Sequence, residues 1–153
     1  MNDEWTLNTD GGARGNPGPG GAGIVLRDPS GDVACRGGAF LGVVTNNVAE
    51  YQALLWGLRA AIALGARRVL VLADSELVVK QLRGEYRVKN EGLKPLFLEA
   101  QSLRRQLDGV VFEHVVRADN AEADVLANEA MDSRASIGDA PDPPCGRADT
   151  LFG

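Results

Sequence analysis

Residues 5–24, WTLNTDGGARGNPGPGGAGI, carry the strongest clue to the architecture of this chain. The start of this stretch is rich in β-favouring residues, which predicts a strand that ends at Asp10. An acid at the end of a central strand lies where open α/β sheets place their ligands. The glycines that follow remove side-chain bulk, so a large ligand could approach the backbone closely. On this stretch alone the alternative stays open, namely a turn in which Asp10 bonds only its own backbone.

The next segments predict an antiparallel meander. Residues 23–28 and 32–41 are expected as strands, and the turn between them is short, which favours antiparallel pairing. Some of the glycines match the dinucleotide-binding pattern G-x-G-x-x-G by spacing. We exclude that site, because Pro19 lies inside the match and a strand rather than a helix follows it.

The middle of the chain carries two more acids at structured positions. Residues 45–65 predict a long helix, because apolar residues recur along it with helical spacing. Glu50 falls in its opening turns at the edge of the buried face, where an acid can also serve the helix dipole alone. The apolar run 67–74 predicts a strand buried on both faces, and it ends on Asp74. A helix at 75–83 follows, so Asp74 lies at a βα turn.

The last elements complete an α/β pattern. Residues 93–107 predict an amphipathic helix, residues 110–116 a strand and residues 119–131 a final helix, with Asp119 or Asn120 as its cap. Asp124 lies in the first turn of the final helix, beside a face of small residues that can pack closely on a sheet. The single histidine, His114, is expected as a packed strand residue rather than a base. Residues 1–131 are thus expected as the folded domain, and the proline-containing residues 132–153 as a tail or linker.

Composition sets few limits. The 153 residues suit one domain, and no apolar run approaches the roughly 18 residues of a membrane span. Two cysteines are too few for a disulfide framework, so a cytoplasmic protein is the expectation, with a single Cys35–Cys145 disulfide left open. The net charge is −5, of which residues 1–131 carry −3. Two divalent cations would offset that charge, so it does not exclude a nucleic-acid partner.

The order of elements brings the four acids together. Right-handed crossovers place the strand 67–74 beside the first strand and parallel to it, so Asp10 and Asp74 lie at the same end of the sheet. The helices of Glu50 and Asp124 can begin at that end. Four clustered carboxylates repel one another unless cations are bound, and oxygen-only ligands select Mg²⁺ or Mn²⁺. Two such ions clamp the attacking and leaving oxygens in phosphoryl transfer, so the sequence predicts metal-dependent hydrolysis of a phosphodiester.

The same residues form four motifs, which are Asp10-Gly-Gly with Asn16-Pro-Gly, Thr45-Asn-Asn-x-x-Glu50, Asp74-Ser, and Asn120-x-x-x-Asp124. In this order the motifs resemble those of type 1 ribonuclease H, over residues 4–131. The resemblance implies a five-stranded mixed sheet, with its second strand antiparallel, flanked by helices. It also implies endonucleolytic cleavage of the RNA strand of RNA–DNA hybrids to 5′-phosphate and 3′-hydroxyl ends. The four carboxylates would hold two Mg²⁺ or Mn²⁺ ions.

The resemblance further implies contacts to the hybrid. Residues matched to phosphate and minor-groove contacts are Asn16, Thr45, Asn46 and Asn47. Residues expected near RNA 2′-hydroxyls are Gly11, Gly12 and Ala13, through their backbone, and Glu76. Reading a 2′-hydroxyl distinguishes RNA from DNA. Glu76 departs from the family, in which well-known members have Gln, and a carboxylate accepts but does not donate a hydrogen bond.

Two other departures concern binding and catalysis. Many bacterial members carry a long basic protrusion that grips the hybrid, and here the connection 83–94 is much shorter. Fewer basic contacts predict weaker binding and a shallower salt dependence. Many members also have a histidine in a loop before the last helix. Here Arg117 is the candidate replacement, as in the archaeal-type branch, and its expected role is to steer a phosphate, because Arg stays charged. A surface Arg without that role is the alternative.

Three alternatives remain at this stage. The chain could bind hybrid or double-stranded RNA without cutting, although such a module would be free to lose acids and this chain keeps all four. It could be one half of a fusion enzyme with a C-terminal phosphatase-like domain. Double-stranded RNA could also be a side substrate. Nothing in the sequence requires an oligomer, so a monomer is expected.

Overall fold

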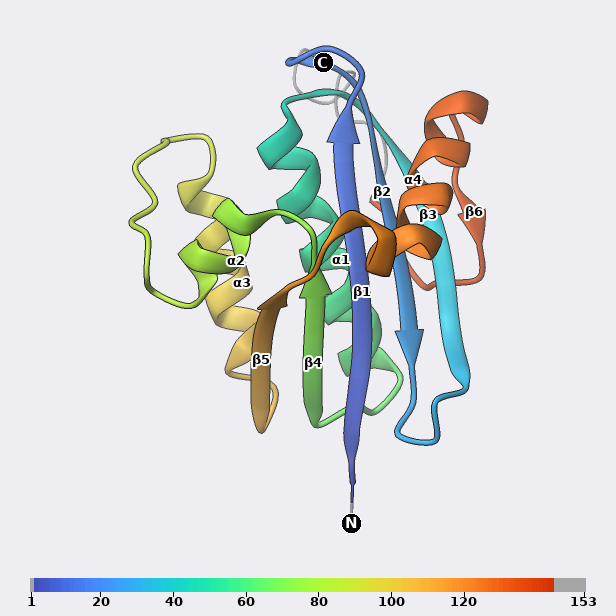
Figure 1. Ribbon diagram of the computed structural model, residues 1–153, viewed down its shortest axis with the longest axis vertical. Helices are drawn as coiled ribbons and strands as arrows, with labels where there is room; N and C mark the ends of the chain where they lie inside the picture. The colour runs from blue at the N-terminus through green and yellow to red at the C-terminus, as the bar shows by residue number, and fades with distance from the viewer. Residues whose placement is uncertain (1, 145–153) are drawn as a thin grey trace.

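The computed structural model describes residues 2–144, which form a mixed sheet of six strands with helices on both faces (Figure 1). The strands are β1 (Glu4–Ala13), β2 (Gly18–Arg27), β3 (Val33–Val44), β4 (Arg68–Ala73), β5 (Gly109–His114) and β6 (Ile137–Gly138). The helices are α1 (Asn46–Ala63), α2 (Glu76–Leu82), α3 (Lys94–Arg104) and α4 (Ala121–Ser133), with a 3₁₀ turn η1 at Arg117–Asn120. The strand order is β5-β4-β1-β2-β3-β6.

The predicted topology is confirmed. β1 pairs in parallel with β4 on one side and antiparallel with β2 on the other, and β2 also pairs antiparallel with β3. β1 is therefore the central strand of the molecule (Figure 1). The helix α1 carries the largest fully buried side chains, Tyr51 and Trp56, into the core between this sheet and α3.

The end of β1 differs from the prediction. The strand does not stop at Asp10 but continues to Ala13, which pairs with Gly20 of β2. The β1–β4 ladder ends earlier, at the pair Thr9 and Ala73. Asp10 thus lies inside β1, at the level where the neighbouring strand stops. The prediction was wrong because glycines favour turns locally, whereas hydrogen bonding to β2 holds them in an extended strand.

The glycines also allow the two helix layers to approach the sheet. A β-carbon on Gly11 would overlap the backbone of Ala49 in α1, and one on Gly23 would overlap the carbonyl of Ala123 in α4. The two helices lie on opposite faces of the sheet (Figure 1). The missing side chains therefore set how close α1 and α4 come to the strands that carry and flank Asp10.

A sixth strand extends the five expected from the resemblance. β6 pairs antiparallel with Gly37 and Gly38 of β3, and the indole Nε1 of Trp56 donates a 2.8 Å hydrogen bond to the carbonyl of Pro141. Residues 137–141 therefore pack on the domain and do not form a free linker. A two-residue strand has no periodic signal, so only its pairing with β3 reveals it. The domain boundary at residue 131 stays a prediction. The disulfide left open between Cys35 and Cys145 also stays untested, because Cys145 lies outside the described range.

Within residues 2–144, no helix combines the length and the apolar character needed to cross a bilayer.

Candidate active site

Three carboxylates from three elements meet at one end of the sheet. Asp10 comes from the middle of β1, Glu50 from the second turn of α1, and Asp74 from the residue after β4. One ligand oxygen from each lies within 4.8 Å of the other two. The parallel pairing of β1 with β4 places the two aspartates side by side, and the start of α1 brings Glu50 to the same end.

The local field disfavours several negative charges at this point. Burial raises the pKa of Asp10 to about 8, and the charges of Asp74 and Asp124 add to the effect. Burial also raises the pKa of Glu50 well above its ordinary value, with Asp10 and Asp74 as further causes. The Asp74 Oδ2 atom is buried and has no hydrogen-bond partner among residues 2–144. A buried oxygen without a hydrogen bond in a repulsive carboxylate cluster fits a bound cation.

Asp124 approaches this cluster from the opposite face of the sheet. It lies in the first turn of α4, and its carboxylate helps to raise the pKa of Asp10, both by accepting a hydrogen bond from protonated Asp10 and by its charge. Asn120 precedes α4 as its N-cap residue, but its side chain does not cap the helix as predicted. It accepts a 3.0 Å hydrogen bond from Asn8 and donates a 2.8 Å bond to the carbonyl of Thr9, so it ties the helix start to β1.

The four acids line a groove of about 420 Å³. Its lining consists of Asp10, Gly11, Gly12, Ala13, Arg14, Asn46, Asn47, Glu50, Asp74, Ser75, Arg117, Asp124, Asn128 and Met131. The Arg117 side chain is 83% exposed, and its Nε lies 3.9 Å from Asp74 Oδ2. Glu76 does not line this groove. It is exposed at the start of α2, where it forms a 2.9 Å ion pair with Lys80 that lowers the pKa of Glu76.

The predicted phosphate-contact residues connect the β1–β2 hairpin to α1. Asn16 Oδ1 accepts a 3.0 Å hydrogen bond from the backbone N–H of Asn46, and Asn46 Oδ1 accepts a 2.8 Å bond from the N–H of Ala13. Thr45 is the N-cap of α1 and accepts from the N–H of Val48. Asn16, Thr45, Asn46 and Asn47 line a second hollow next to the groove. These polar side chains therefore shape the rim of the site.

Four groove residues were not predicted, namely Arg14, Ser75, Asn128 and Met131. Asn128 and Met131 follow Asp124 by four and seven residues, so helical spacing alone could have found them. Ser75 follows Asp74 and caps α2. Arg14 gives no local signal, because its contacts cross to α4. His114, predicted to be packed, is exposed at the end of β5, which makes that prediction wrong.

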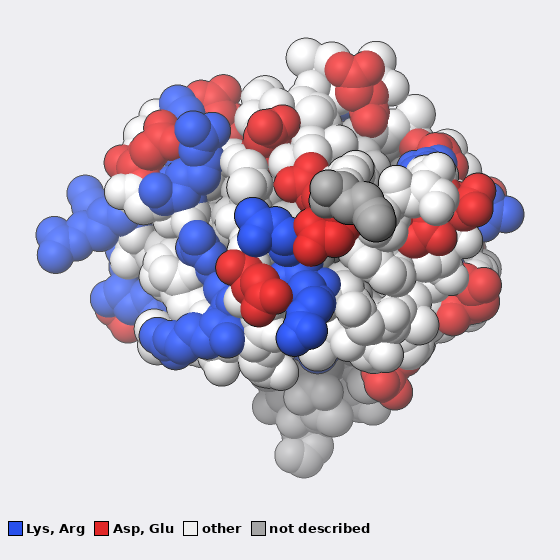
Figure 2. Space-filling model, turned by 90° about the horizontal axis from the view of Figure 1, so that it is seen from below, with Lys and Arg blue, Asp and Glu red and all other residues white. Residues whose placement is uncertain are grey.

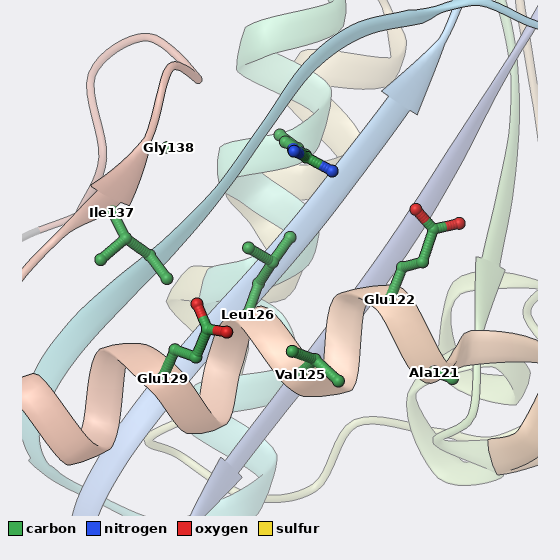
Figure 3. Close-up of a pocket in the computed structure, with 8 residues that line it drawn as sticks. Ala121, Glu122, Val125, Leu126, Glu129, Ile137 and Gly138 are labelled. Carbon is green, nitrogen blue, oxygen red and sulfur yellow. The ribbon is translucent and has the colours of Figure 1, made fainter.

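A third hollow, of about 480 Å³, lies between α4 and β6 (Figure 3). Val125 and Leu126 of α4 face Ile137 of β6 across it, with Glu122 and Glu129 beside them (Figure 3). None of the predicted site residues lines this hollow. This hollow and the carboxylate groove therefore lie along different flanks of α4.

Basic side chains gather on one side of the end of the molecule that is seen in Figure 2, with acidic side chains among them. At the strand starts, for example, Arg67 lies 3.3 Å from Asp108 and Arg68 lies 3.7 Å from Asp3. These strand starts are opposite the end of the sheet that carries Asp10. The positive charge there is partly neutralised and does not surround the carboxylate groove.

Comparisons with known proteins agree with this geometry. A family model described as reverse transcriptase-like matches residues 8–130. The bifunctional protein Rv2228c of Mycobacterium tuberculosis is 47% identical over 131 residues, which is 84% of this chain and 36% of that protein. The chain thus spans about a third of the length of this relative.

Two solved structures are similar over nearly their whole length. RNase H1 from Halobacterium salinarum is 40% identical with a TM-score of 0.82, covering 85% of this chain and 98% of that one. LC11-RNase H1 in complex with an RNA/DNA hybrid is 41% identical with a TM-score of 0.80, covering 85% and 98%. The chain belongs to the type 1 ribonuclease H family.

Proposed function

We propose that this protein hydrolyses the RNA strand of RNA–DNA hybrids with the help of two Mg²⁺ or Mn²⁺ ions. The observation that carries the proposal is the convergence of Asp10, Glu50 and Asp74, whose ligand oxygens lie within 4.8 Å of one another. The Asp74 Oδ2 atom, which accepts no hydrogen bond within residues 2–144, and the raised pKa of Asp10 support a site built for cations. A relative with 41% identity is known in complex with an RNA/DNA hybrid, which supports the substrate class.

The four carboxylates Asp10, Glu50, Asp74 and Asp124 would hold the ions. When bound, such ions act as Lewis acids on the oxygens of a phosphodiester and neutralise the charge that develops there. The protein supplies a rigid oxygen cage, since each acid comes from a separate element of the packed sheet. We expect products with 5′-phosphate and 3′-hydroxyl ends, as the family resemblance implies.

The remaining groove residues would position the hybrid. Gly11 and Gly12 line the groove, and Gly12 leaves the β1 backbone open, since a β-carbon there would meet nothing nearer than 4.0 Å, so RNA 2′-hydroxyls could approach it. Arg117 is exposed and reaches toward Asp74, which suits a guanidinium that holds a phosphate beside the carboxylates. Asn16, Thr45, Asn46 and Asn47 would contact phosphates at the rim. Glu76 lies outside the groove, and its carboxylate is paired with Lys80, so it would have to leave that ion pair to contact a 2′-hydroxyl.

The decisive experiment is cleavage of a strand-labelled RNA–DNA hybrid with Mg²⁺ or Mn²⁺, beside Asp10→Asn and a chelator control. We expect the RNA strand alone to be cut, and the activity to be lost in both controls. Binding of the hybrid without cleavage under either metal would leave the non-cleaving module. Cleavage that survives Asp10→Asn would indicate a contaminating nuclease. Competition with double-stranded RNA in the same assay tests the side substrate.

A further inference from the structure

The three flanks of α4 face different surroundings. Ala123, Ala127 and Ala130 are buried against the sheet, close to the glycines of β2. The flank shown in Figure 3, with Leu126 and Glu129, faces the hollow beside β6. Asp124, Asn128 and Met131 follow one another at i, i+4 and i+7 and line the carboxylate groove. Asn128 therefore stands in the same row as the carboxylate of Asp124.

Asn128 is hydrogen-bonded in both directions along this row. Its Nδ2 donates to the carbonyl of Asp124 at 3.0 Å and to the Asp124 carboxylate Oδ1 at 3.3 Å. Its Oδ1 accepts a 3.2 Å hydrogen bond from Arg14 Nη2. The other terminal nitrogen of Arg14 forms a 2.7 Å ion pair with Asp132, one turn further along α4. Arg14, the residue after β1, is thus joined to the carboxylate of Asp124 through the side-chain amide of Asn128.

The chemistry of the two partners determines which way the amide faces. An arginine side chain has only donors, so the amide oxygen of Asn128 must face Arg14. The amide nitrogen of Asn128 then faces Asp124 and donates to its carboxylate. With the amide turned the other way, its oxygen would face the carboxylate and be repelled by it. Arg14 is held in turn by Asp132, so the orientation does not depend on Asn128 alone.

We propose that Asn128, oriented by Arg14, is a positioning residue that keeps the carboxylate of Asp124 turned toward Asp10. This inference rests on the proposed metal-dependent function. Asp124 belongs to the helix on the opposite face from α1, and it meets a cluster whose charges repel it. Without a donor on its own side, its side chain has other rotamers that point away from the groove. The hydrogen bond from Asn128 holds the geometry that a second ion requires.

The size of the effect follows from comparable supporting residues. Substituting a residue that orients a metal ligand typically lowers metal affinity or activity about 10- to 100-fold. The 3.3 Å bond is long, so we expect the low end of this range, about 10-fold. The loss should appear in the Mn²⁺ dissociation constant and in kcat, with little change in KM for the hybrid.

The test compares Asn128→Leu and Arg14→Lys with Arg27→Ala. Leucine keeps the branched shape of the Asn128 side chain, although it is larger, and removes its hydrogen bonds. Lysine can keep the ion pair with Asp132 but has no second planar nitrogen to bind Asn128. Arg27 is the matched control, because it also joins the sheet to α4, through a 2.6 Å ion pair with Glu122, but it does not line the groove. Each variant is measured by calorimetric titration with MnCl₂, hybrid cleavage and thermal unfolding.

We expect Asn128→Leu and Arg14→Lys to weaken Mn²⁺ binding about 10-fold, and Arg27→Ala to leave it within about twofold of wild type. Unchanged Mn²⁺ affinity in both groove variants, or an equal loss in Arg27→Ala, would overturn the proposal. Failure of the wild-type protein to cleave the hybrid is a separate outcome. It removes the proposed function, whereas a selective loss of Mn²⁺ affinity in the groove variants still supports the positioning role.

Discussion

Asp10 shows how one buried residue couples the site to the stability of the fold. Its pKa is raised from 3.8 to about 8, so between these pH values the folded protein retains a proton that the unfolded chain has released. Raising the pH through this window therefore favours the unfolded state when no metal is bound. The residue that would hold the ions destabilises the metal-free protein near neutral pH.

The first prediction follows from this linkage. In the presence of a chelator, the wild-type midpoint of thermal unfolding should fall as the pH rises from about 5 to about 8, and Asp10→Asn should flatten that dependence. At pH 8 we expect the variant to unfold about 3 °C or more above wild type, equivalent to about 1 kcal/mol. Asp32→Asn, which changes an exposed acid between β2 and β3, is the control. An identical pH dependence in wild type and Asp10→Asn would contradict the raised pKa.

The second prediction concerns Arg117. Because this side chain is 83% exposed, Arg117→Ala should leave the midpoint of thermal unfolding within about 1 °C of wild type. Its removal should lower kcat for hybrid cleavage about 10-fold or more, since the phosphate loses a positioning contact. Arg117→Lys should recover part of the rate by keeping the charge. Full activity in Arg117→Ala would show that Arg117 is only a surface residue.

At the scale of elements, glycines decide where the helices lie. Gly23 faces Ala123 so closely that a methyl group cannot fit without moving α4. Asp124 directly follows Ala123 in that helix, so such a movement would shift the Asp124 carboxylate relative to Asp10. Packing at Gly23 therefore affects the geometry of the site although Gly23 does not line the groove.

The third prediction is that Gly23→Ala lowers the free energy of unfolding by about 1–3 kcal/mol, as in other overpacked cores. It should also weaken Mn²⁺ binding, because α4 is displaced. Gly12→Ala is a matched control for stability, since a β-carbon at Gly12 would meet nothing nearer than 4.0 Å. Urea denaturation of both variants measures the difference. Equal stability of Gly23→Ala and wild type would mean that α4 can adjust without cost.

The fourth prediction tests the segment after α4. Trp56→Phe keeps an aromatic ring in the core but removes the indole donor to Pro141. We expect a loss of about 1 kcal/mol from the hydrogen bond and a further loss from the volume that the smaller ring leaves empty, so the unfolding midpoint should fall by at least about 2–4 °C. Hybrid cleavage should be unchanged at temperatures below the transition. No change in the midpoint would indicate that residues 137–141 add little to the stability of the domain.

At the scale of the whole molecule, charge is spread in a way that limits nucleic-acid affinity. The basic residues on the end seen in Figure 2 are interspersed with acids, and at the strand starts Arg67 and Arg68 have acidic partners. The connection between α2 and α3 is short and has its own ion pairs, one of them between Arg83 and Glu85. These ion pairs reduce the number of basic groups that are free to replace the counterions of a hybrid.

The fifth prediction is a shallow salt dependence of hybrid binding. With Asp10→Asn and Mg²⁺, the slope of log K against log salt should be about −3, which corresponds to three or four phosphate contacts. Fluorescence anisotropy with a labelled hybrid at several KCl concentrations measures it. A slope of about −6 or steeper would reveal a basic surface that the groove does not include.

Much of the fold could be read from local patterns. The apolar runs at β4 and α1 and the turn between β2 and β3 predicted the element order, because each signal lies within a single element. The placement of Asp10 beside Asp74 followed from the handedness of crossovers, which holds for nearly every parallel pair. The end of β1, the strand β6 and the exposure of His114 could not be read in this way. They depend on the pairing of β1 with β2, on the pairing of β6 with β3, and on the place of β5 at the edge of the sheet, none of which lies within one element.

The motifs alone were enough to indicate the family by resemblance. The order of elements predicted the parallel pairing that joins the first two acids, and the residue types predicted an oxygen-only site. The burial of Asp10, the binding of Asn120 to β1 in place of capping α4, and the contact of Arg14 with Asn128 are visible in the folded protein alone. Burial and long-range hydrogen bonds are properties of packed neighbours, and no window of sequence contains both partners.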